Sequence, residues 1–268
     1  MNGPDRLTAA ENNWRSRMGL SFPGERVVYR GKDLFADLGE SSWMGLYLYG
    51  ITGRPFSANQ LHLFEAMWVI SSSYPDPRLW NNRVASLAGT ARSTGALGIS
   101  AAVAVTEATI YGFRPIIKAF VALKEVAALA ARGEDIEAYL IDELRANRTI
   151  AGYGRPVINF DERIEPLMAT ARRLGLADGP HVQLAFRIEE ILQRRRYRLH
   201  MNVAALASAL AADQGLSRRE YYNYLIPCFI AGMVPCWMEA SEKGEGEFLP
   251  LSCRRVAYNG PARRPWKE

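Results

Sequence analysis

Apolar residues recur at helical spacing along most of this sequence, and the alternation typical of strands is rare. In the segment 59–71 the apolar positions form one wide face, and Ser57 just before it is suited to cap a helix. Alternation is confined to 26–30, with a second short extended piece expected at 254–258. The 3.6-residue period predicts further helices over 116–131, 135–147, 164–174, 182–195, 202–214 and 218–233. The pattern therefore predicts an all-α fold with almost no sheet.

Small residues dominate the segment 84–110. Because small side chains let helix axes approach closely, we expect one helix or a broken pair of helices here, in the middle of the core. Short stretches of glycine, proline and aspartate separate the helical segments, and none is long enough to link independent domains. A chain of 268 residues then forms one large domain or two that share a core.

The composition is that of an ordinary globular chain, with 49% hydrophobic and 23% charged residues and a net charge of +5. These values exclude disordered, collagen-like and disulfide-scaffold classes. Three cysteines, an odd number, indicate buried thiols in a reducing compartment, so we expect a cytoplasmic protein. The first residues lack the apolar run of a signal peptide. The longest uncharged stretch, 93–106, is shorter than the roughly 18–20 residues of a membrane span, so we expect no membrane partner.

One dense basic run, 193–198, is the only feature that could support nucleic-acid binding. Two other interpretations fit it. It can be a solvated helix end, in which Glu189 and Glu190 pair with Arg194 across a turn. It can also bind the phosphates of an acidic cofactor. We expect no nucleic-acid partner.

The sequence offers no recognisable metal site or nucleotide motif. His62, His181 and His200 are scattered, and the cysteines lack the two-residue spacing of a zinc site, so we expect no metal. A nucleophile elbow, a phosphate-binding loop and a dinucleotide fingerprint are missing as well.

The stretch from 150 to 157 is the most distinctive local feature. Two glycines flank an aromatic residue in Gly152-Tyr153-Gly154, and such a tight turn can lay its backbone against a flat ring or an anion. It can equally be a plain connection between two helices. Asp161-Glu162-Arg163 follows just before the next expected helix.

Taken together, several motifs resemble, in order and spacing, those of citrate synthases and citryl-CoA lyases. The resemblance spans about residues 27–260. It rests on the turn with its Asp-x-Arg, Tyr-Arg-Gly at 29–31, the segment 46–55, Arg-Ser-Thr at 92–94 in the small-residue segment, Leu-Gly-Leu at 174–176 and Leu-His-Met-Asn-Val at 199–203.

The resemblance implies a two-domain helical fold, an obligate homodimer and a coenzyme A site between the domains. The large domain is then 1–115 plus 221–268, and the small domain is 116–220. The family's turn holds the adenine end of coenzyme A, which carries over to Gly152, Tyr153 and Gly154, with Ala151 beside them. The family's arginine that binds a substrate carboxylate carries over to Arg163, which lies one position earlier than in the family pattern. Asn202 is expected to bind substrate as well.

The chain departs from this family at all three catalytic positions. The histidine after the turn is Arg155, the aspartate of Asn-Val-Asp is Ala204, and the first histidine falls at Ser73 or Tyr74. Two further arginines that bind carboxylates are replaced by Phe229 and Leu249. Since alanine cannot accept a proton, the family's usual base is missing, and we expect a substrate with fewer acidic groups than citrate.

Three residues are the candidates for altered chemistry. Arg155 stays cationic at any working pH, so it suits stabilisation of an enolate or carboxylate rather than proton transfer. Tyr74 can stabilise an oxyanion, and Asp76 can replace the base. Asp161, Glu162 and Glu107 are further candidates for the base. Each carboxylate can instead be a cap or a surface group, and Glu107, expected to be buried, can instead pair with an arginine.

The resemblance implies an enzyme that makes or cleaves a C–C bond next to a coenzyme A thioester, with an acyl-CoA and a small organic acid or carbonyl compound as partners. Two alternatives remain. The same fold can serve an acyl-CoA hydrolase or isomerase, or a non-catalytic homologue that has lost the three catalytic groups.

Overall fold

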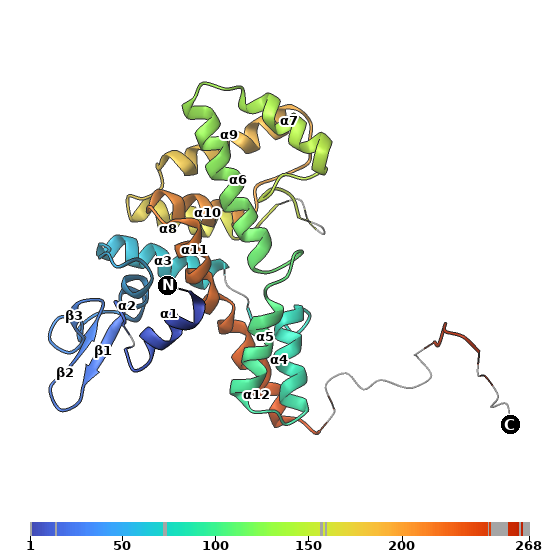
Figure 1. Cartoon of the computed structure of the whole chain (residues 1–268). Coiled ribbons are helices and arrows are strands. Elements are labelled where there is room, and N and C mark those ends of the chain that lie inside the picture. The colour runs from blue at the N-terminus through green and yellow to red at the C-terminus, as the bar shows by residue number, and fades with distance from the viewer. Residues whose placement is uncertain are drawn as a thin grey trace. The chain divides into compact units, whose positions relative to one another are not determined.

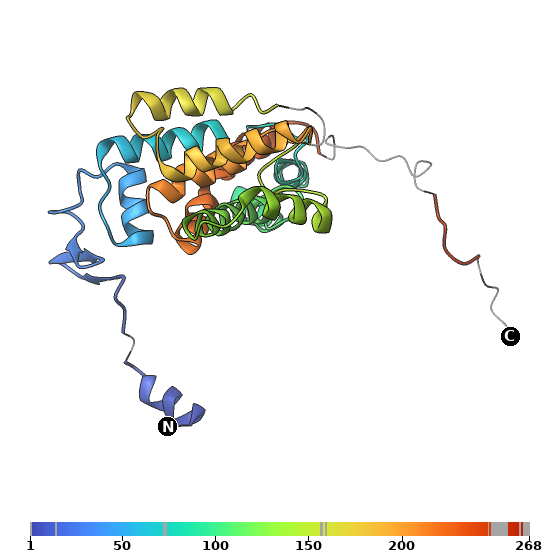
Figure 2. The ribbon, with the colours of Figure 1, turned by 90° about the horizontal axis from the view of Figure 1, so that it is seen from above.

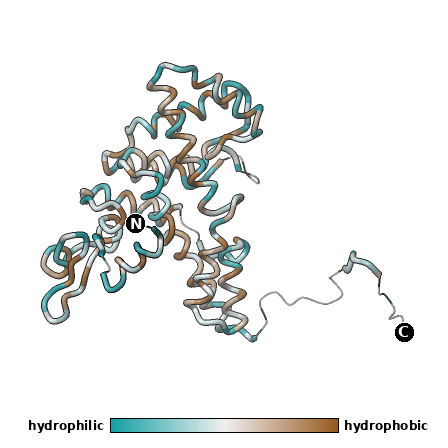
Figure 3. Tube along the Cα trace, viewed as in Figure 1, coloured by the Kyte–Doolittle hydropathy of each residue, from teal (hydrophilic) through white to brown (hydrophobic). Residues whose placement is uncertain are grey.

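The computed structural model describes residues 2–13, 15–71, 74–155, 158, 160–245, 247, 257–262 and 264. Figure 1 shows that helices make up most of the chain, and Figure 3 shows both hydrophobic and hydrophilic residues along many of them. In chain order the elements are α1 (Gly3–Ala10), β1 (Gly19–Phe22), β2 (Arg26–Tyr29), β3 (Lys32–Asp33), α2 (Trp43–Thr52), α3 (Ala58–Ser71), α4 (Trp80–Thr90), α5 (Gly95–Val105), α6 (Phe113–Ala131), α7 (Ile136–Asn147), α8 (Ile164–Arg173), α9 (Pro180–Arg194), α10 (Val203–Asp213), α11 (Arg218–Cys228) and α12 (Ile230–Glu242).

The predicted all-α class is confirmed. The strand expected at 26–30 is β2, in a small antiparallel sheet of order β1-β2-β3. Most of the extended piece expected at 254–258 lies outside the described residues, as do Ser73 and Leu249.

The chain forms two compact units. The first unit is Met1–Ser72 with Glu107–Cys228, and the second unit is Ser73–Thr106 with Phe229–Glu268. These bounds differ from those of the large and small helical domains expected from the sequence, and that division stays a prediction.

The core of the first unit lies where α6, α9 and α10 pack side by side (Figures 1 and 2). Almost every residue of α10 is buried, from Val203 and Ala205 through Ala212. Because most of these residues are alanine, neighbouring helices approach α10 closely on several sides. The start of this central helix is therefore a fixed point on which loops can be anchored.

The Tyr-Arg-Gly segment has a structural role in the first unit. The Arg30 guanidinium donates from Nε to the carbonyl of Gly50 (2.8 Å) and from Nη2 to that of Ile51 (3.1 Å). The Tyr49 hydroxyl donates back to the Arg30 carbonyl at 3.0 Å. Arg30 thus satisfies carbonyls in the last turn of α2, where a cation also complements the helix dipole.

The second unit packs α4, α5 and α12 together. The small-residue segment forms two helices, α4 and α5, which is the broken pair named among the two expectations. Thr94 caps the second helix of the pair. A Cβ on Gly98 would lie 2.7 Å from that of Ala88, and one on Gly89 would lie 2.5 Å from the Trp237 carbonyl oxygen. These helices can reach their packing distance only with glycine at these positions.

By length and composition alone, the helical stretch Arg218–Glu242 is apolar enough to cross a membrane. In the protein, 44% of its most apolar window is buried, and core helices of proteins that never enter a membrane pass the same test of length and composition. The absence of a membrane partner stays a prediction.

Candidate functional site

The Gly-Tyr-Gly turn (residues 152–154) is attached by backbone pairing to the chain that leads into α10. The Gly154 N–H donates to the His200 carbonyl at 2.6 Å, and the Asn202 N–H donates to the Gly152 carbonyl at 2.9 Å. Between them, Tyr153 and Met201 form an antiparallel bridge. The turn therefore has a fixed position at the N-terminus of the central helix.

Both glycines of the turn are required by its geometry. Gly152 has φ +90° and Gly154 has φ +86°, in the left-handed region that favours glycine. A Cβ on Gly152 would also lie 2.7 Å from the Cβ of Ala205 on α10 and 3.2 Å from that of Ala119 on α6. The turn is thus wedged between the two helices.

Tyr153 points into the protein rather than toward solvent. Its side chain is buried, and its hydroxyl donates to the carbonyl of Ala185 on α9 at 2.7 Å. Burial raises the pKa of this phenol, and the nearby charge of Glu189 raises it further. The ring therefore anchors the turn to α9, and only part of it faces the cavity described next.

A partly enclosed cavity of about 110 Å³ lies behind the turn, and we call it the turn recess. Ala151 and Tyr153 form one side of it, and aliphatic residues of α6, α7 and α9 form most of the rest. Its polar groups are the carboxylates of Glu125 and Glu143 and the phenol of Tyr139. Burial first, and then the charges of these carboxylates, raise the pKa of Tyr139, so that phenol remains a hydrogen-bond donor.

A wider cavity of about 810 Å³, which we call the turn groove, runs along α6. Its wall includes Ala151, Gly152 and Tyr153 of the turn, and Lys118 and Arg218 contribute cationic side chains. Three of the four residues predicted to bind the cofactor therefore border a cavity of substantial volume. Gly154 borders neither cavity and instead holds the turn to residues 200–202.

Asn202 also holds the turn in place. Its side-chain oxygen accepts from the Ala204 N–H at 3.0 Å and so caps α10, and its Nδ2 donates to the Gly154 carbonyl at 2.9 Å. Both the oxygen and the nitrogen of the Asn202 amide thus have protein partners. The role of Asn202 in binding substrate stays a prediction. Ala204, in the first turn of α10, offers no polar side chain.

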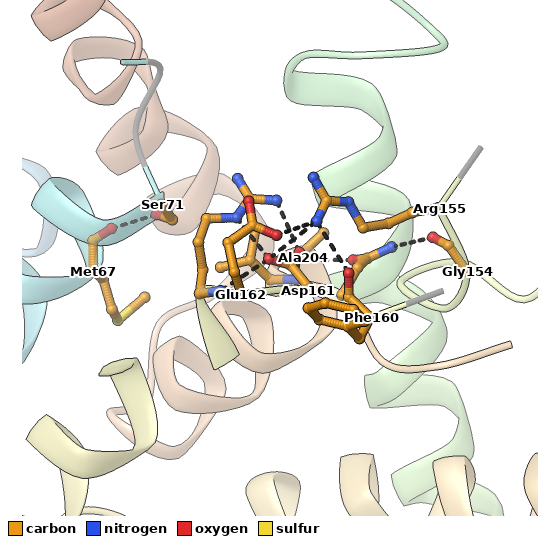
Figure 4. Close-up of polar contacts among 11 residues, drawn as sticks. Met67, Ser71, Gly154, Arg155, Phe160, Asp161, Glu162 and Ala204 are labelled. Carbon is orange, nitrogen blue, oxygen red and sulfur yellow. Dashed lines mark hydrogen bonds and ion pairs between the residues drawn. The ribbon is translucent and has the colours of Figure 1, made fainter. Parts of the chain in front are cut away.

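Arg163, predicted to bind a substrate carboxylate, makes a two-point contact with Asp161 inside the protein. Both hydrogen bonds, Nε to Oδ1 and Nη2 to Oδ2, measure 2.8 Å, and the carboxylate is fully buried (Figure 4). Asp161 also accepts from the Val203 N–H at 2.8 Å. Burial by itself would raise the pKa of Asp161, but the hydrogen bonds and charge of Arg163 outweigh it and hold that pKa below its usual value.

Arg155 is held more loosely, beside the same cluster. Its Nη1 donates to the carboxylate of Glu162 and, at 3.1 Å, to the carbonyl of Phe160, and it lies 3.8 Å from Asp161 (Figure 4). Hydrogen bonding from its own backbone N–H and then from Arg155 lowers the pKa of Glu162. The Glu162 side chain is 56% exposed, so an incoming carboxylate can replace it at Arg155.

Tyr74 and Asp76 belong to the second unit, whereas the other predicted site residues belong to the first. Asn82, fully buried, donates from Nδ2 to the carbonyls of Tyr74 (2.6 Å) and Asp76 (3.1 Å) and so shapes this loop. Asp76 pairs with the guanidinium of Arg78, whose hydrogen bonds lower the pKa of the carboxyl. The Tyr74 side chain is exposed. Their catalytic roles stay predictions.

Two sequence-based expectations about charged residues are wrong in detail. Glu107 is exposed rather than buried, because α5 ends at Val105, although it does pair with an arginine, Arg114, at 3.7 Å. In the basic run, Arg194 pairs with Glu137 of α7 and not with Glu189 or Glu190. Glu189 instead accepts a hydrogen bond from the Met201 N–H at 2.9 Å.

The residues that line the turn groove outside the turn were not predicted from the sequence. Lys118 and Glu125 are charged residues on the mostly apolar helix α6, and this contrast is the sequence signal that could have found them. Among the described residues, no group of three or more His, Cys, Asp or Glu could hold a metal ion.

The predicted citrate-synthase-like fold is confirmed by solved structures. Citryl-CoA lyase from Hydrogenobacter thermophilus matches with a TM-score of 0.83 and 20% identity, over 95% of this chain and 98% of that one. ATP citrate lyase from Methanothrix soehngenii, in complex with citrate and coenzyme A, matches with a TM-score of 0.76 and 18% identity, over 98% and 45%. Citrate synthase from Thermoplasma acidophilum matches with a TM-score of 0.66 and 17% identity, over 85% and 59%. Neither a family model nor the sequence of a curated protein matches this chain.

Proposed function

We propose that this protein is an enzyme that makes or cleaves a C–C bond next to the carbonyl of a coenzyme A thioester, with a substrate other than citrate. The observation that carries the proposal is the Gly-Tyr-Gly turn, which is fixed to the start of α10 and borders both the turn recess and the turn groove. The three solved structures compared above are a citryl-CoA lyase, an ATP citrate lyase in complex with citrate and coenzyme A, and a citrate synthase in complex with carboxymethyl coenzyme A and oxaloacetate.

The dimensions and lining of the cavities support an acyl-CoA as substrate. Aliphatic side chains form most of the turn recess, and its polar groups are two carboxylates and the phenols of Tyr139 and Tyr153, which suits a flat ring that carries an amino group. Along the turn groove, Ile117, Val121 and Ala122 provide an apolar strip for a pantetheine arm, and Lys118 and Arg218 provide cations for phosphates.

Arg155 supplies the electrostatic part of the proposed reaction. When the C–C bond next to a thioester carbonyl breaks or forms, negative charge develops on the thioester oxygen. A guanidinium that donates two hydrogen bonds stabilises that charge without giving up its own proton. Release of Glu162 by the substrate would free Arg155 for this task.

The base is the part of the mechanism most changed from the family pattern. Asp161 is a poor candidate, because Arg163 and the Val203 N–H occupy its oxygens in a buried site. Glu162 and Asp76 remain. The hydrogen bonds that lower the pKa values of these carboxylates also make them weaker bases, so the one that serves has to leave its arginine, Arg155 or Arg78, when substrate binds. Tyr74 would assist as a hydrogen-bond donor.

We also propose a homodimer in which each chain has a large helical domain, 1–115 plus 221–268, and a small helical domain, 116–220. On α5 of the second unit, Leu97 is 66% exposed and Val105 is 40% exposed, and the helix buries only Gly98 and Ala102 in its own chain. Such an apolar face suits a second copy of the chain. We also keep the expectation of a cytoplasmic protein with no nucleic-acid or membrane partner.

A panel of acyl-CoA thioesters, each with and without small keto acids and aldehydes, tests the proposal. Free thiol, detected with a chromogenic reagent, and the acyl product, identified by mass spectrometry, distinguish the reactions. A carbonyl product from cleavage, or thiol release that requires an acceptor, supports C–C chemistry. Thiol release by water alone supports a hydrolase, and an isomeric acyl-CoA supports an isomerase. No thermal shift and no turnover with any thioester would support the non-catalytic alternative.

A further inference from the structure

Phe160 exposes a large apolar side chain beside Arg155. The residue is 60% exposed, and its carbonyl accepts a hydrogen bond from Arg155 Nη1 at 3.1 Å (Figure 4). The next residue, Asp161, has a fully buried carboxylate that accepts hydrogen bonds from Arg163 and from the Val203 N–H. The backbone that carries the Phe160 ring is therefore fixed, although the residue itself is exposed to solvent.

The polar side chains next to Arg155 already have partners in the protein. The Asn202 amide accepts a hydrogen bond from one backbone N–H and donates to one backbone carbonyl. Both oxygens of the Asp161 carboxylate accept hydrogen bonds from Arg163. A further polar group on a ligand would lose its water here without gaining a free partner among these side chains, which is unfavourable.

The first turn of α10 adds a second apolar group to this cluster. The side chain of Ala204, which is half-buried, is a methyl group that offers neither charge nor a hydrogen bond. Figure 4 shows Ala204 in the same cluster as Arg155 and Phe160. Among the described residues of the cluster, a ligand therefore meets the Arg155 guanidinium, once Glu162 has left it, and apolar side chains.

We infer that the thioester carries a hydrocarbon acyl chain longer than acetyl and that Phe160 selects this chain. The chain in question is the part that remains on the sulfur after cleavage or that enters bond formation. The inference rests on the proposed function, in which Arg155 stabilises charge on the thioester oxygen. Because the acyl chain begins at the carbon that carries this oxygen, it starts next to Arg155, where the Phe160 ring can lie against it. Contact between ring and chain is favourable because apolar surface of both leaves water.

Calorimetric titration of the full chain with coenzyme A, acetyl-CoA, pentanoyl-CoA and γ-hydroxybutyryl-CoA tests this inference in the absence of a carbonyl partner. Each methylene that is buried adds about fourfold in affinity, so pentanoyl-CoA is expected to bind about tenfold or more tightly than acetyl-CoA. The chain of γ-hydroxybutyryl-CoA has the same length as the pentanoyl chain but ends in a hydroxyl instead of a methyl. This thioester is expected to bind about fivefold or more weakly than pentanoyl-CoA.

Variants of Phe160 assign the preference to its ring. Phe160→Ala is expected to reduce the preference for pentanoyl-CoA over acetyl-CoA to about threefold or less, with affinity for coenzyme A within about twofold of the wild type. Phe160→Leu keeps an apolar side chain and is expected to keep most of the preference. Phe35→Ala is the matched control, because it removes a phenyl ring that is 67% exposed at a position after β3, and it should leave all four affinities unchanged. Urea unfolding checks that each variant is folded, as expected for changes at exposed positions.

The outcomes separate this inference from the proposed function. Equal affinity of the wild type for acetyl-CoA and pentanoyl-CoA would overturn the inference, and so would a Phe160→Ala variant that keeps the wild-type preference. Both results leave the proposed function intact, because coenzyme A binding and turnover are measured independently. A preference for pentanoyl-CoA that depends on Phe160, without turnover, would support the inference and count against the enzymatic proposal. Failure of the wild type to bind any of the thioesters would overturn both.

Discussion

The guanidinium of Arg163 and the carboxylate of Asp161 meet through two parallel hydrogen bonds of 2.8 Å, and the second oxygen of that carboxylate also accepts the N–H of Val203. This contact joins the segment after the Gly-Tyr-Gly turn to the first residue of α10. Arg163 therefore already has a carboxylate partner inside the protein. The contact between Arg163 and Asp161 therefore positions the turn, and any contact of Arg163 with a substrate is additional to this structural role.

Replacement of the buried carboxylate tests this structural role. We expect Asp161→Asn to lower the free energy of unfolding by about 3 kcal/mol, because it leaves Arg163 without its charged partner in a site largely hidden from water. Urea denaturation measures the loss. Glu162→Gln is the matched control, since its side chain is 56% exposed, and we expect a change below about 0.5 kcal/mol. Equal stability of Asp161→Asn and the wild type would contradict the role given to Asp161.

The same pair predicts a dependence of stability on acid. The pKa of Asp161 is lower in the folded protein than in the unfolded chain, so the unfolded state takes up a proton first as the pH falls. Its contribution is therefore complete above about pH 5 and is lost as the pH falls below about 4, toward the folded-state pKa. The difference in unfolding free energy between wild type and Asp161→Asn, followed from pH 6 downward, should shrink in this window. A constant difference would show that the charge of Asp161 is not responsible.

The helices could be predicted from the sequence, because apolar residues at a 3.6-residue period define one buried face whatever the partner is. The predicted helix 202–214 is α10, Val203–Asp213. Partners of charged residues could not be predicted. Glu137 reaches Arg194 from a helix 57 residues earlier in the sequence, and only the packing of α7 against its neighbours brings them together.

The candidate site was predictable to a similar extent. The glycines of the turn indicate its left-handed backbone, which the structure has. Asn202 was also singled out from the sequence, and it contacts the turn through the Gly154 carbonyl. The inward direction of Tyr153 depends on the carbonyl of Ala185, which no local pattern indicates. The charged lining of the turn groove comes from α6, α7 and α11, whose contacts are a property of the fold.

A comparison of two glycines separates backbone strain from close packing. Gly152 and Gly175 both have positive φ, but only Gly152 has neighbours where a Cβ would be, whereas Gly175 has none within 4 Å. Gly175→Ala is expected to cost about 1 kcal/mol from backbone strain alone. Gly152→Ala is expected to cost about 3 kcal/mol, because the turn must also move away from α10. Similar losses for the two variants in thermal or urea unfolding would show that the turn is not wedged between α6 and α10.

Arg155 is expected to affect turnover more than stability. Its partner Glu162 is exposed, so Arg155→Ala should change the free energy of unfolding by less than about 1 kcal/mol. With the true thioester substrate, kcat should fall by about 100-fold or more, as when one donor to a developing oxyanion is removed. Glu162→Gln distinguishes the two candidates for the base: if Asp76 is the base, kcat is retained and KM falls because the competitor for Arg155 is weakened, whereas kcat is lost if Glu162 is the base. Unchanged turnover in Arg155→Ala would remove this residue from the mechanism.

The two cavities beside the turn make different predictions for its neighbouring side chains. Ala151 lines both the turn recess and the turn groove, so Ala151→Trp would fill the space proposed for the adenine end of coenzyme A and should weaken binding by about tenfold or more. Tyr153→Phe keeps the ring and removes only the hydrogen bond to Ala185, so stability should fall by about 1 kcal/mol while affinity for coenzyme A is retained. Calorimetric titration with coenzyme A measures both variants. If Ala151→Trp binds as tightly as the wild type, then coenzyme A does not occupy these cavities, and the turn only connects two helices.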